Sequence, residues 1–172
     1  FELKYILGDS LYYAAMQHYF SKWKLKHVNE NRFINSFEEY VDQDLNWFFD
    51  PWLHTTRKLD YAISNFKTMK NEEGSWDVEL GINNLGNRFL PMKIKTYFSD
   101  GTSNNRWWDR HLWRFQDTLK YTTSKQPVKV VMDPEVQTLD MDLRNNSTKM
   151  KKTILFDWPG IWYNPRDEMV YW

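Results

Sequence analysis

The stretch YILGDSLYYAAMQHYFSKWKLKHVNENRFINSFEEYVDQDLNWFFDPWLHTTRKLDYAI, residues 5–63, decides the fold of the first part of the chain. Its apolar residues recur at helical spacing, in a row four residues apart and in a neighbouring row: Leu11, Ala15, Tyr19 and Trp23, then Tyr12, Met16 and Phe20. Two adjacent rows give a helix one broad apolar face. The stretch therefore predicts a helix that packs against other elements, with Asp9 or Ser10 as its cap.

Two further helices are predicted in the same stretch. Apolar residues again follow helical spacing, at Phe33, Phe37, Tyr40 and Val41 and then at Leu45, Phe48, Phe49, Trp52 and Leu53. Asn29 or Asn31 is expected to cap the first of these helices and Asp44 the second. Pro51 lies inside the second run and should kink or shorten that helix, because proline has no backbone N–H to donate.

After Thr56 the apolar residues alternate, which is typical of strands. Four segments show this pattern: LDYAISNF, SWDVELGIN, MKIKTYFSD and VKVVMD, at 59–66, 75–83, 92–100 and 128–133. Segment 111–123, HLWRFQDTLKYTT, predicts a strand pair or one long bulged strand. The fold class is α+β, with an N-terminal three-helix segment followed by an antiparallel, Ig-like β-sandwich. We expect a helical domain at 1–56, the sandwich at 57–146 and an irregular aromatic-rich tail at 147–172.

Composition narrows the possible functions. The 172 residues carry 23 basic and 23 acidic side chains, so there is no basic surplus for a phosphate backbone and no nucleic acid is expected as a partner. No apolar run approaches the roughly 20 residues that span a bilayer, so no transmembrane segment is expected. The chain has no cysteine, which excludes disulfides, thiolate metal sites and cysteine nucleophiles. Aromatic residues make up 18% of the chain and can fill a core.

The residues that carry chemistry in other proteins are scattered here. The four histidines, His18, His27, His54 and His111, are never three or four residues apart, so no helix turn holds two metal ligands. The pairs Glu38–Glu39 and Glu72–Glu73 are interpreted as structural residues without a catalytic role. One glutamate of the first pair is expected to form an ion pair with a nearby basic side chain. No G-x-S-x-G elbow or glycine-rich phosphate loop occurs. The sequence therefore predicts no catalytic residue and no metal ligand.

Three tryptophans form the one candidate binding surface. Trp107, Trp108 and Trp113 can present an aromatic platform to a peptide or a sugar, although core packing is the favoured interpretation. Adjacent residues of a strand point to opposite faces, so one of Trp107 and Trp108 is expected to be exposed. The alternative function is accordingly a peptide- or glycan-binding module with no enzymatic role.

A string of residues connects the first 63 positions to a known family. Its members are Leu7, Gly8 and Asp9, then Tyr19, Phe20, Lys22, Trp23 and Lys24, then Phe33 and Glu39, then Asp44, Leu45, Trp47, Phe48, Phe49, Trp52 and Leu53. In this order they resemble the aminopeptidase N-like zinc metallopeptidases, where such a string closes the catalytic domain. Asp133, Pro134, Leu139, Asp140, Asn145 and Asn146 resemble the end of the β-domain that follows it. Asp42 stands where relatives commonly have glycine, and aspartate tolerates the left-handed conformation better than most residues.

The resemblance implies a non-catalytic, C-terminal part of a zinc aminopeptidase that supports the catalytic domain during peptide hydrolysis. In the family, zinc is bound by two histidines of an HExxH helix and a downstream glutamate, all expected before Phe1. Zinc is thus a cofactor of the full-length parent and not of this chain, which should be inactive alone. The implied partners are the N-terminal catalytic half and the parent's peptide substrate, and the family favours a periplasmic or cell-envelope location. A third hypothesis is a parent that lost its zinc site.

The resemblance also makes a structural prediction. Leu3, Ile6, Leu7 and parts of Leu11–Trp23 should face the catalytic half, so an apolar patch is expected there when that half is absent.

Overall fold

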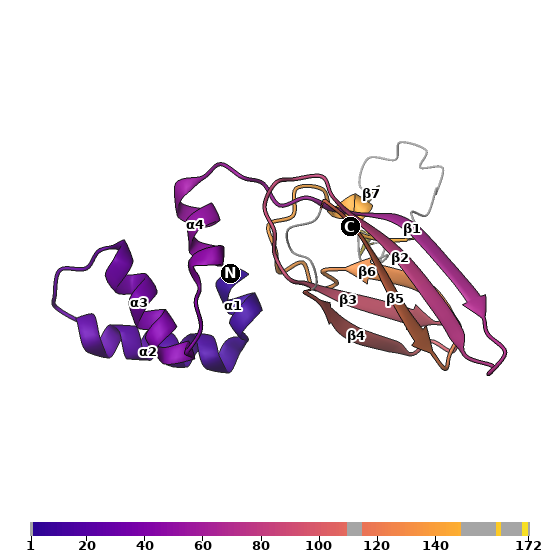
Figure 1. Ribbon diagram of the computed structural model, residues 1–172, viewed down its shortest axis with the longest axis horizontal. Coiled ribbons are helices and arrows are strands. Elements are labelled where there is room, and N and C mark those ends of the chain that lie inside the picture. Colours follow the sequence, from indigo (N-terminus) through magenta and orange to yellow (C-terminus); the bar gives the residue numbers. More distant parts are fainter. Residues whose placement is uncertain (1, 110–114, 149–160, 163–169, 172) are drawn as a thin grey trace. The chain divides into compact units, whose positions relative to one another are not determined.

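Four helices make up the first of the two units into which the chain divides, Phe1–Arg57 and Lys58–Trp172 (Figure 1). The computed structural model describes residues 2–109, 115–148, 161–162 and 170–171. The helices are α1 (Glu2–Leu7), α2 (Asp9–Trp23), α3 (Glu30–Val41) and α4 (Asn46–His54). The three predicted helices correspond to α2, α3 and α4, and α1 is a short helix that ends at Leu7.

The start of α2 differs from the prediction. Gly8 is the N-cap residue, with a positive φ of 78° that favours glycine. Asp9 is already the first residue of the helix, so the expected cap at Asp9 or Ser10 is wrong. The carboxylate of Asp9 instead lies 3.0 Å from the Lys4 ammonium of α1.

Later helix ends follow the sequence more closely. The side chain of Asn29 accepts a hydrogen bond from the backbone N–H of Arg32 at 3.0 Å, which confirms Asn29 as the cap of α3. Asp42 ends α3 in the left-handed region, with φ 53° and ψ 43°, as expected for a residue in a glycine position. Asp44 is not the cap of α4, because Leu45 holds that position, and helix α4 continues through Pro51 to His54.

Aromatic rings form the core of the helical unit. The ring of Phe33 in α3 lies 5.0 Å from that of Tyr19 in α2 and 5.8 Å from that of Phe49 in α4, measured between centroids. Ala15 of α2 and Phe37 of α3 are completely buried. Because each buried ring removes about 150–250 Å² from water, these contacts hold α2, α3 and α4 together.

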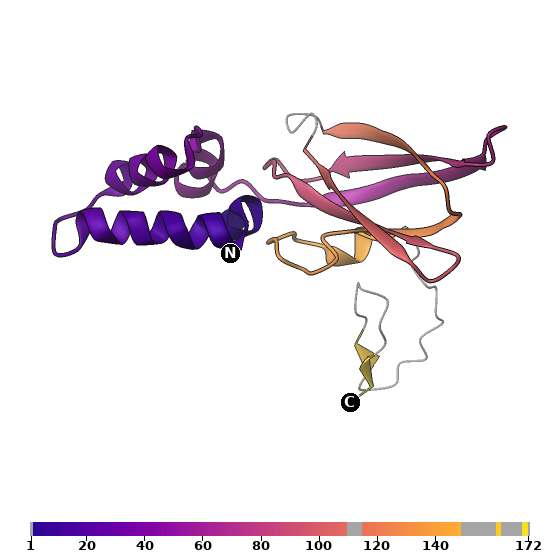
Figure 2. The same cartoon turned by 90° about the horizontal axis from the view of Figure 1, so that it is seen from below.

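Two three-stranded antiparallel sheets form the second unit (Figures 1 and 2). Their strands are β1 (Tyr61–Lys70), β2 (Trp76–Asn84), β3 (Met92–Phe98), β4 (Ser103–Trp108), β5 (Gln116–Thr123) and β6 (Pro127–Met132). The strand order is β1-β2-β5 in one sheet and β4-β3-β6 in the other. The helices followed by a sandwich-like pair of sheets confirm the predicted α+β class.

Two strands differ from the predicted segments in their extent. The segment expected at 59–66 extends to Lys70 in β1, and segment 111–123 supplies the single strand β5 within the described residues. The tail is not wholly irregular at its start, because Ser147 bridges Val131 and the N–H of Thr148 donates to the carbonyl of Val130 at 3.0 Å. Further along, β7 (Ile161–Trp162) pairs with β8 (Val170–Tyr171). The tail residues Trp158, Tyr163 and Trp172 lie outside the described residues.

The core of the second unit lies between the sheets. Alternate residues of β3 are buried, namely Met92, Ile94, Thr96 and Phe98. The Thr96 hydroxyl is 2.7 Å from that of Tyr121 in β5, so a hydrogen bond joins the two sheets. Tyr61 of β1 is fully buried, and its ring meets that of Trp108 in β4 edge to face at 5.3 Å. The Tyr61 hydroxyl donates to the Leu90 carbonyl at 3.2 Å and accepts from the Leu90 N–H at 3.1 Å.

Asp42 provides a test of the helix end. Asp42→Val should lower the free energy of unfolding by about 1–2 kcal/mol, because a β-branched residue is strained at positive φ. Asp42→Gly should leave it unchanged or raise it by up to about 1 kcal/mol. Urea unfolding followed by helical circular dichroism measures both. Gln43→Val is the matched control at the next exposed position, and an equal loss for Gln43→Val and Asp42→Val would contradict the account.

Tyr61 provides a test of the sandwich core. Burial raises the pKa of Tyr61 to about 12, above its ordinary value of 10.0. A raised pKa in the folded state means that the stabilising contribution is complete below pH 10.0 and is lost as the pH rises toward about 12. The unfolding free energy of the unmodified chain should therefore fall more steeply over this range than that of Tyr61→Phe, by up to about 1.4 kcal/mol per pH unit. Urea titrations at several alkaline pH values decide this, and parallel profiles would refute it.

Candidate functional site

His18, His54 and the pair Glu38–Glu39 contact neighbouring residues, whereas Glu72 and Glu73 are exposed in the turn between β1 and β2. His54 contacts Glu30 at 2.7 Å, whereas His18 Nε2 is 3.8 Å from a Glu39 oxygen, too long for a hydrogen bond. Residues 2–109, 115–148, 161–162 and 170–171 contain no group of three or more His, Cys, Asp or Glu side chains placed to hold a metal ion. His111 lies outside these ranges.

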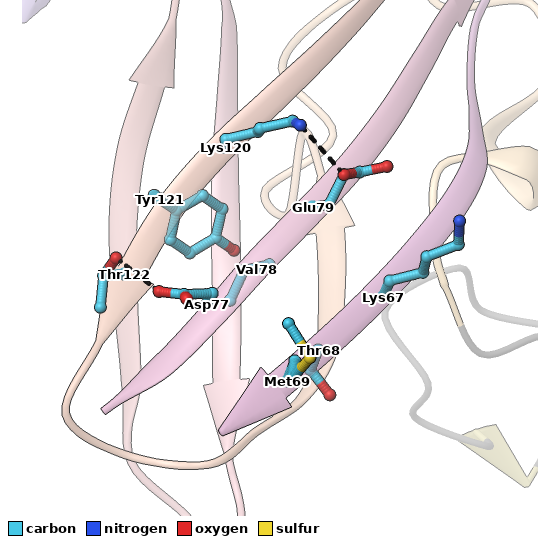
Figure 3. A pocket seen from close by; sticks show the side chains of 9 residues that line it. All are labelled: Lys67, Thr68, Met69, Asp77, Val78, Glu79, Lys120, Tyr121 and Thr122. Carbon is cyan, nitrogen blue, oxygen red and sulfur yellow. Dashed lines mark hydrogen bonds and ion pairs between the residues drawn. The ribbon is translucent and has the colours of Figure 1, made fainter. Parts of the chain in front are cut away.

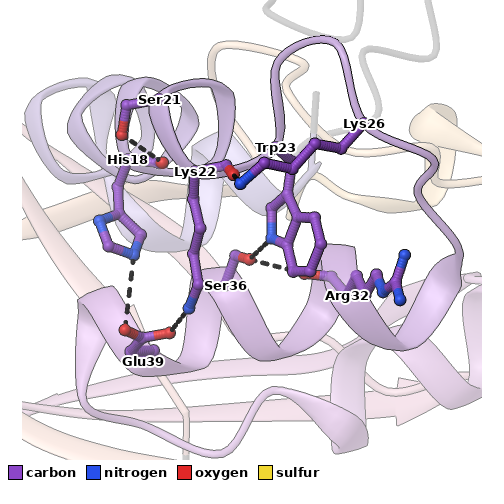
Figure 4. Close-up of polar contacts among 8 residues, drawn as sticks. All are labelled: His18, Ser21, Lys22, Trp23, Lys26, Arg32, Ser36 and Glu39. Carbon is purple, nitrogen blue, oxygen red and sulfur yellow. Dashed lines mark hydrogen bonds and ion pairs between the residues drawn. The ribbon is translucent and has the colours of Figure 1, made fainter.

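The two glutamates of the first pair, Glu38 and Glu39, contact different neighbours. Glu39 forms an ion pair with Lys22 of α2, and the hydrogen bond from Lys22 lowers the pKa of Glu39 (Figure 4). This is the predicted pairing with a nearby base. Glu38 accepts a hydrogen bond from the backbone N–H of Leu45 at 2.8 Å, just before α4, a role that spacing alone could not reveal. Both carboxylates thus join neighbouring elements of the helical unit.

A second polar contact fixes α2 on α3. The indole N–H of Trp23 donates to the Ser36 hydroxyl at 2.8 Å, and that hydroxyl donates to the Arg32 carbonyl at 2.6 Å (Figure 4). The Arg32 guanidinium lies 4.8 Å from the centroid of the Trp23 ring. These contacts orient one face of α2 toward α3 and leave the opposite face outward.

The outward face of α2 carries exposed aromatic rings. Tyr13 and Phe20 are seven residues apart, so they lie on the same side of the helix, and they are 53% and 66% exposed. We call these two residues the α2 stripe. Of the surface expected to be exposed, Tyr13 and Phe20 are thus exposed, Ile6 and Leu7 are half-buried, and Leu3 is buried.

Trp107 and Trp108 differ in exposure, as expected for adjacent residues of a strand, whose side chains point to opposite faces. Trp108 is 2% exposed and its indole N–H donates to Asp117 at 2.9 Å, whereas Trp107 is 46% exposed. The Lys93 ammonium lies 5.7 Å from the Trp107 ring centroid and 3.3 Å from a Glu135 oxygen. Trp113 lies outside the described residues. The structure thus assigns Trp108 to the core and leaves the idea of an aromatic platform resting on Trp107.

A hollow of about 750 Å³ lies on the sheet β1-β2-β5, and no sequence motif predicted it. Its lining residues come from all three strands: Lys67, Thr68, Met69, Asp77, Val78, Glu79, Lys120, Tyr121 and Thr122 (Figure 3). Lys120 pairs with Glu79 at 3.2 Å, and Thr122 donates to Asp77 at 2.9 Å. Both carboxylates are thus satisfied by neighbouring strands, as on a solvated sheet face. The strand register needed to find this surface was not available from the sequence.

The chain matches a known protein by structure but not by sequence. No protein-family model and no curated protein sequence matches the chain. Among solved structures, it is similar to Legionella pneumophila aminopeptidase A, crystallised in complex with aspartic acid, with a TM-score of 0.52 and 14% sequence identity. The match covers 76% of this chain and 15% of that chain, so this chain spans a small part of the solved aminopeptidase. At this identity the similarity concerns the fold.

Among the described residues, none of the helices combines the length and the apolar character required to cross a bilayer.

Replacement of Trp107 and of Trp108 by alanine should lower the stability of the chain by different amounts. Trp108→Ala should lower the free energy of unfolding by about 3–5 kcal/mol, because it leaves a cavity beside Tyr61 and removes the hydrogen bond to Asp117. Trp107→Ala, on the exposed face of the same strand, should cost less than about 1 kcal/mol. Chemical unfolding of both variants measures the difference. Equal losses would contradict the assignment of Trp108 to the core.

Proposed function

We propose that this chain is a non-catalytic part of a zinc-dependent aminopeptidase, in which the helical unit supports the peptidase domain that hydrolyses the peptide. The observation that carries this proposal is the α2 stripe, two aromatic rings held outward on a helix whose other face is already packed. The fold similarity to part of an aminopeptidase and the aromatic string up to Leu53 support it.

The energetic argument concerns Tyr13 and Phe20. Full burial of a large apolar side chain is worth about 1.5–3 kcal/mol relative to leaving it exposed. Tyr13 and Phe20 lack much of this stabilisation in the helical unit, because their side chains are 53% and 66% exposed. The contacts of Trp23 and Lys22 with α3 prevent α2 from rotating to bury them. A surface that covers the α2 stripe therefore gains binding energy without reorganising the unit.

The proposal assigns no catalytic step to this chain. The sequence has no HExxH pattern, and the described residues bring no set of three zinc ligands together, so they do not fit a catalytic zinc ion. In the proposed parent, zinc would be held by the peptidase domain. The role of the present residues is to position that domain through apolar contacts.

Mutation of the α2 stripe tests the supporting role. In the protein that joins this chain to a peptidase domain, Phe20→Asp should lower the melting temperature of that domain and its turnover of aminoacyl p-nitroanilides, because a carboxylate would be buried at the contact. Met69→Asp is the matched control, since Met69 is 69% exposed but lies on strand β1. Equal effects of the two substitutions, or no effect of Phe20→Asp, would refute the supporting role.

A second measurement separates this proposal from an autonomous enzyme or a binding module. The purified chain with added zinc should not hydrolyse aminoacyl p-nitroanilides above the buffer rate, and chelator-sensitive hydrolysis would refute the non-catalytic assignment. Saturable binding of a peptide or glycan that Trp107→Ala abolishes would favour the alternative module instead.

A further inference from the structure

A cluster of polar residues lies at the start of the β-unit, beside Tyr61. Its members are Asp60, Asp140, Asn145 and Asn146, which we call the Asp60 cluster. The chain brings them together through a parallel bridge between Leu59 and Asp140 and through contacts of the short helix η1 (Leu143–Asn145) with β1. Asp140, Asn145 and Asn146 belong to the residues between Asp133 and Asn146 that resemble the end of a β-domain, and the proposed function gives them no role.

The two carboxylates are close enough to disfavour each other's charge. Asp140 accepts hydrogen bonds from the backbone N–H of Tyr61 at 2.9 Å and of Asp142 at 3.0 Å. Burial nevertheless raises the pKa of Asp140, and the negative charge of Asp60 raises it further. Within the described residues, neither carboxylate forms an ion pair with a lysine, arginine or histidine.

Asn146 supplies an independent observation. Its side chain is 1% exposed, and a hydrogen bond from this side chain lowers the pKa of the Asp140 carboxylate. The Oδ1 atom of the Asn146 amide is buried without a hydrogen bond within the described part of the chain. The Oδ1 atom of Asn145 is also buried without such a bond, although its Nδ2 donates to Asp60 at 3.3 Å.

Two buried amide oxygens that lack hydrogen bonds, those of Asn145 and Asn146, require a partner. Buried polar groups are otherwise almost always satisfied, and an ordered water or ion is the usual explanation for an exception. Two carboxylates and two amide oxygens form a hard oxygen donor set, which suits Ca²⁺ because calcium takes 6–8 oxygen ligands in flexible geometry, water among them. A cation also offsets the repulsion between Asp60 and Asp140, which a water molecule cannot do.

We infer that the Asp60 cluster is a structural binding site for a calcium ion, ligated by the side-chain oxygens of Asp60, Asp140, Asn145 and Asn146. The ion joins the loop before β1 to the segment that follows β6. It stabilises the folded β-unit and takes no part in hydrolysis, so this inference is independent of the peptidase proposal.

Calcium titration of the chelator-treated chain tests the site. Isothermal titration with CaCl2 should give one saturable site, with a dissociation constant of about 10⁻⁴–10⁻³ M, the range of extracellular calcium modules. Mg²⁺ should bind more weakly, because it demands shorter bonds and a stricter octahedral geometry. Saturating Ca²⁺ should raise the melting temperature of the β-unit and shift the ¹⁵N resonances of Asn146 and Tyr61.

The decisive variant is Asp60→Asn, chosen because Asp140 accepts backbone hydrogen bonds that the fold needs. It should weaken Ca²⁺ binding at least about tenfold, since even an outer-shell partner of a metal commonly contributes that much. Without calcium its melting temperature should equal or exceed that of the unmodified chain, because the repulsion is relieved. Glu72→Gln, an exposed glutamate in the β1–β2 turn, is the control and should leave binding unchanged.

Three outcomes would overturn the inference. They are the absence of saturable Ca²⁺ binding up to 10-fold above the expected range, a calcium response in Asp60→Asn equal to that of the unmodified chain, or resonance shifts confined to residues outside the cluster. The first outcome would identify the cluster as a water-filled polar core.

Discussion

Helix α2 carries two adjacent rows of apolar residues, but α3 covers only one of its faces. The rest of the helical unit depends on which face of α2 packs against α3. Trp23 binds Ser36 and Lys22 binds Glu39, so the rotation of α2 about its axis is fixed by polar contacts as well as by Ala15 and the ring of Tyr19. With that face committed, Tyr13 and Phe20 remain outward. Both rings are therefore free to be covered by a partner surface without a change in the packing of α2. Their exposure is the physical basis of the proposed supporting role.

In the β-unit, alternate residues of the strands point into the core between the two sheets, and the polar groups buried there find hydrogen-bond partners. Buried polar groups such as the hydroxyls of Tyr61, Thr96 and Tyr121 are paired across or beside the sheets, so the core tolerates them. The Asp60 cluster departs from this rule, since the amide oxygens of Asn145 and Asn146 are buried without such partners. The proposed cation accounts for that departure and for the absence of ion pairs at Asp60 and Asp140 together.

Much of the fold was predictable because local patterns decide it. Helical spacing located α2, α3 and α4, alternation located β1, β2, β3 and β6, and the residue types at Asn29 and Asp42 identified two helix ends. Gly8 was missed because a side-chain cap at Asp9 looked equally suitable, and only the backbone angles distinguish them. Alternation also predicted that Trp107 and Trp108 differ in exposure. Contacts between distant segments, as in the Asp60 cluster or the hollow of β1-β2-β5, depend on register and loop paths that the residue pattern does not contain.

The central claim is that the α2 stripe is a surface made to be covered by a peptidase domain. Hydroxyl-radical footprinting of the Phe20 and Tyr13 side chains measures their access to solvent directly, in this chain alone and in the protein that joins it to a peptidase domain. The account predicts severalfold less labelling of both rings in the joined protein, with labelling of Met69 unchanged. Equal labelling of Phe20 and Tyr13 in the two proteins would contradict it.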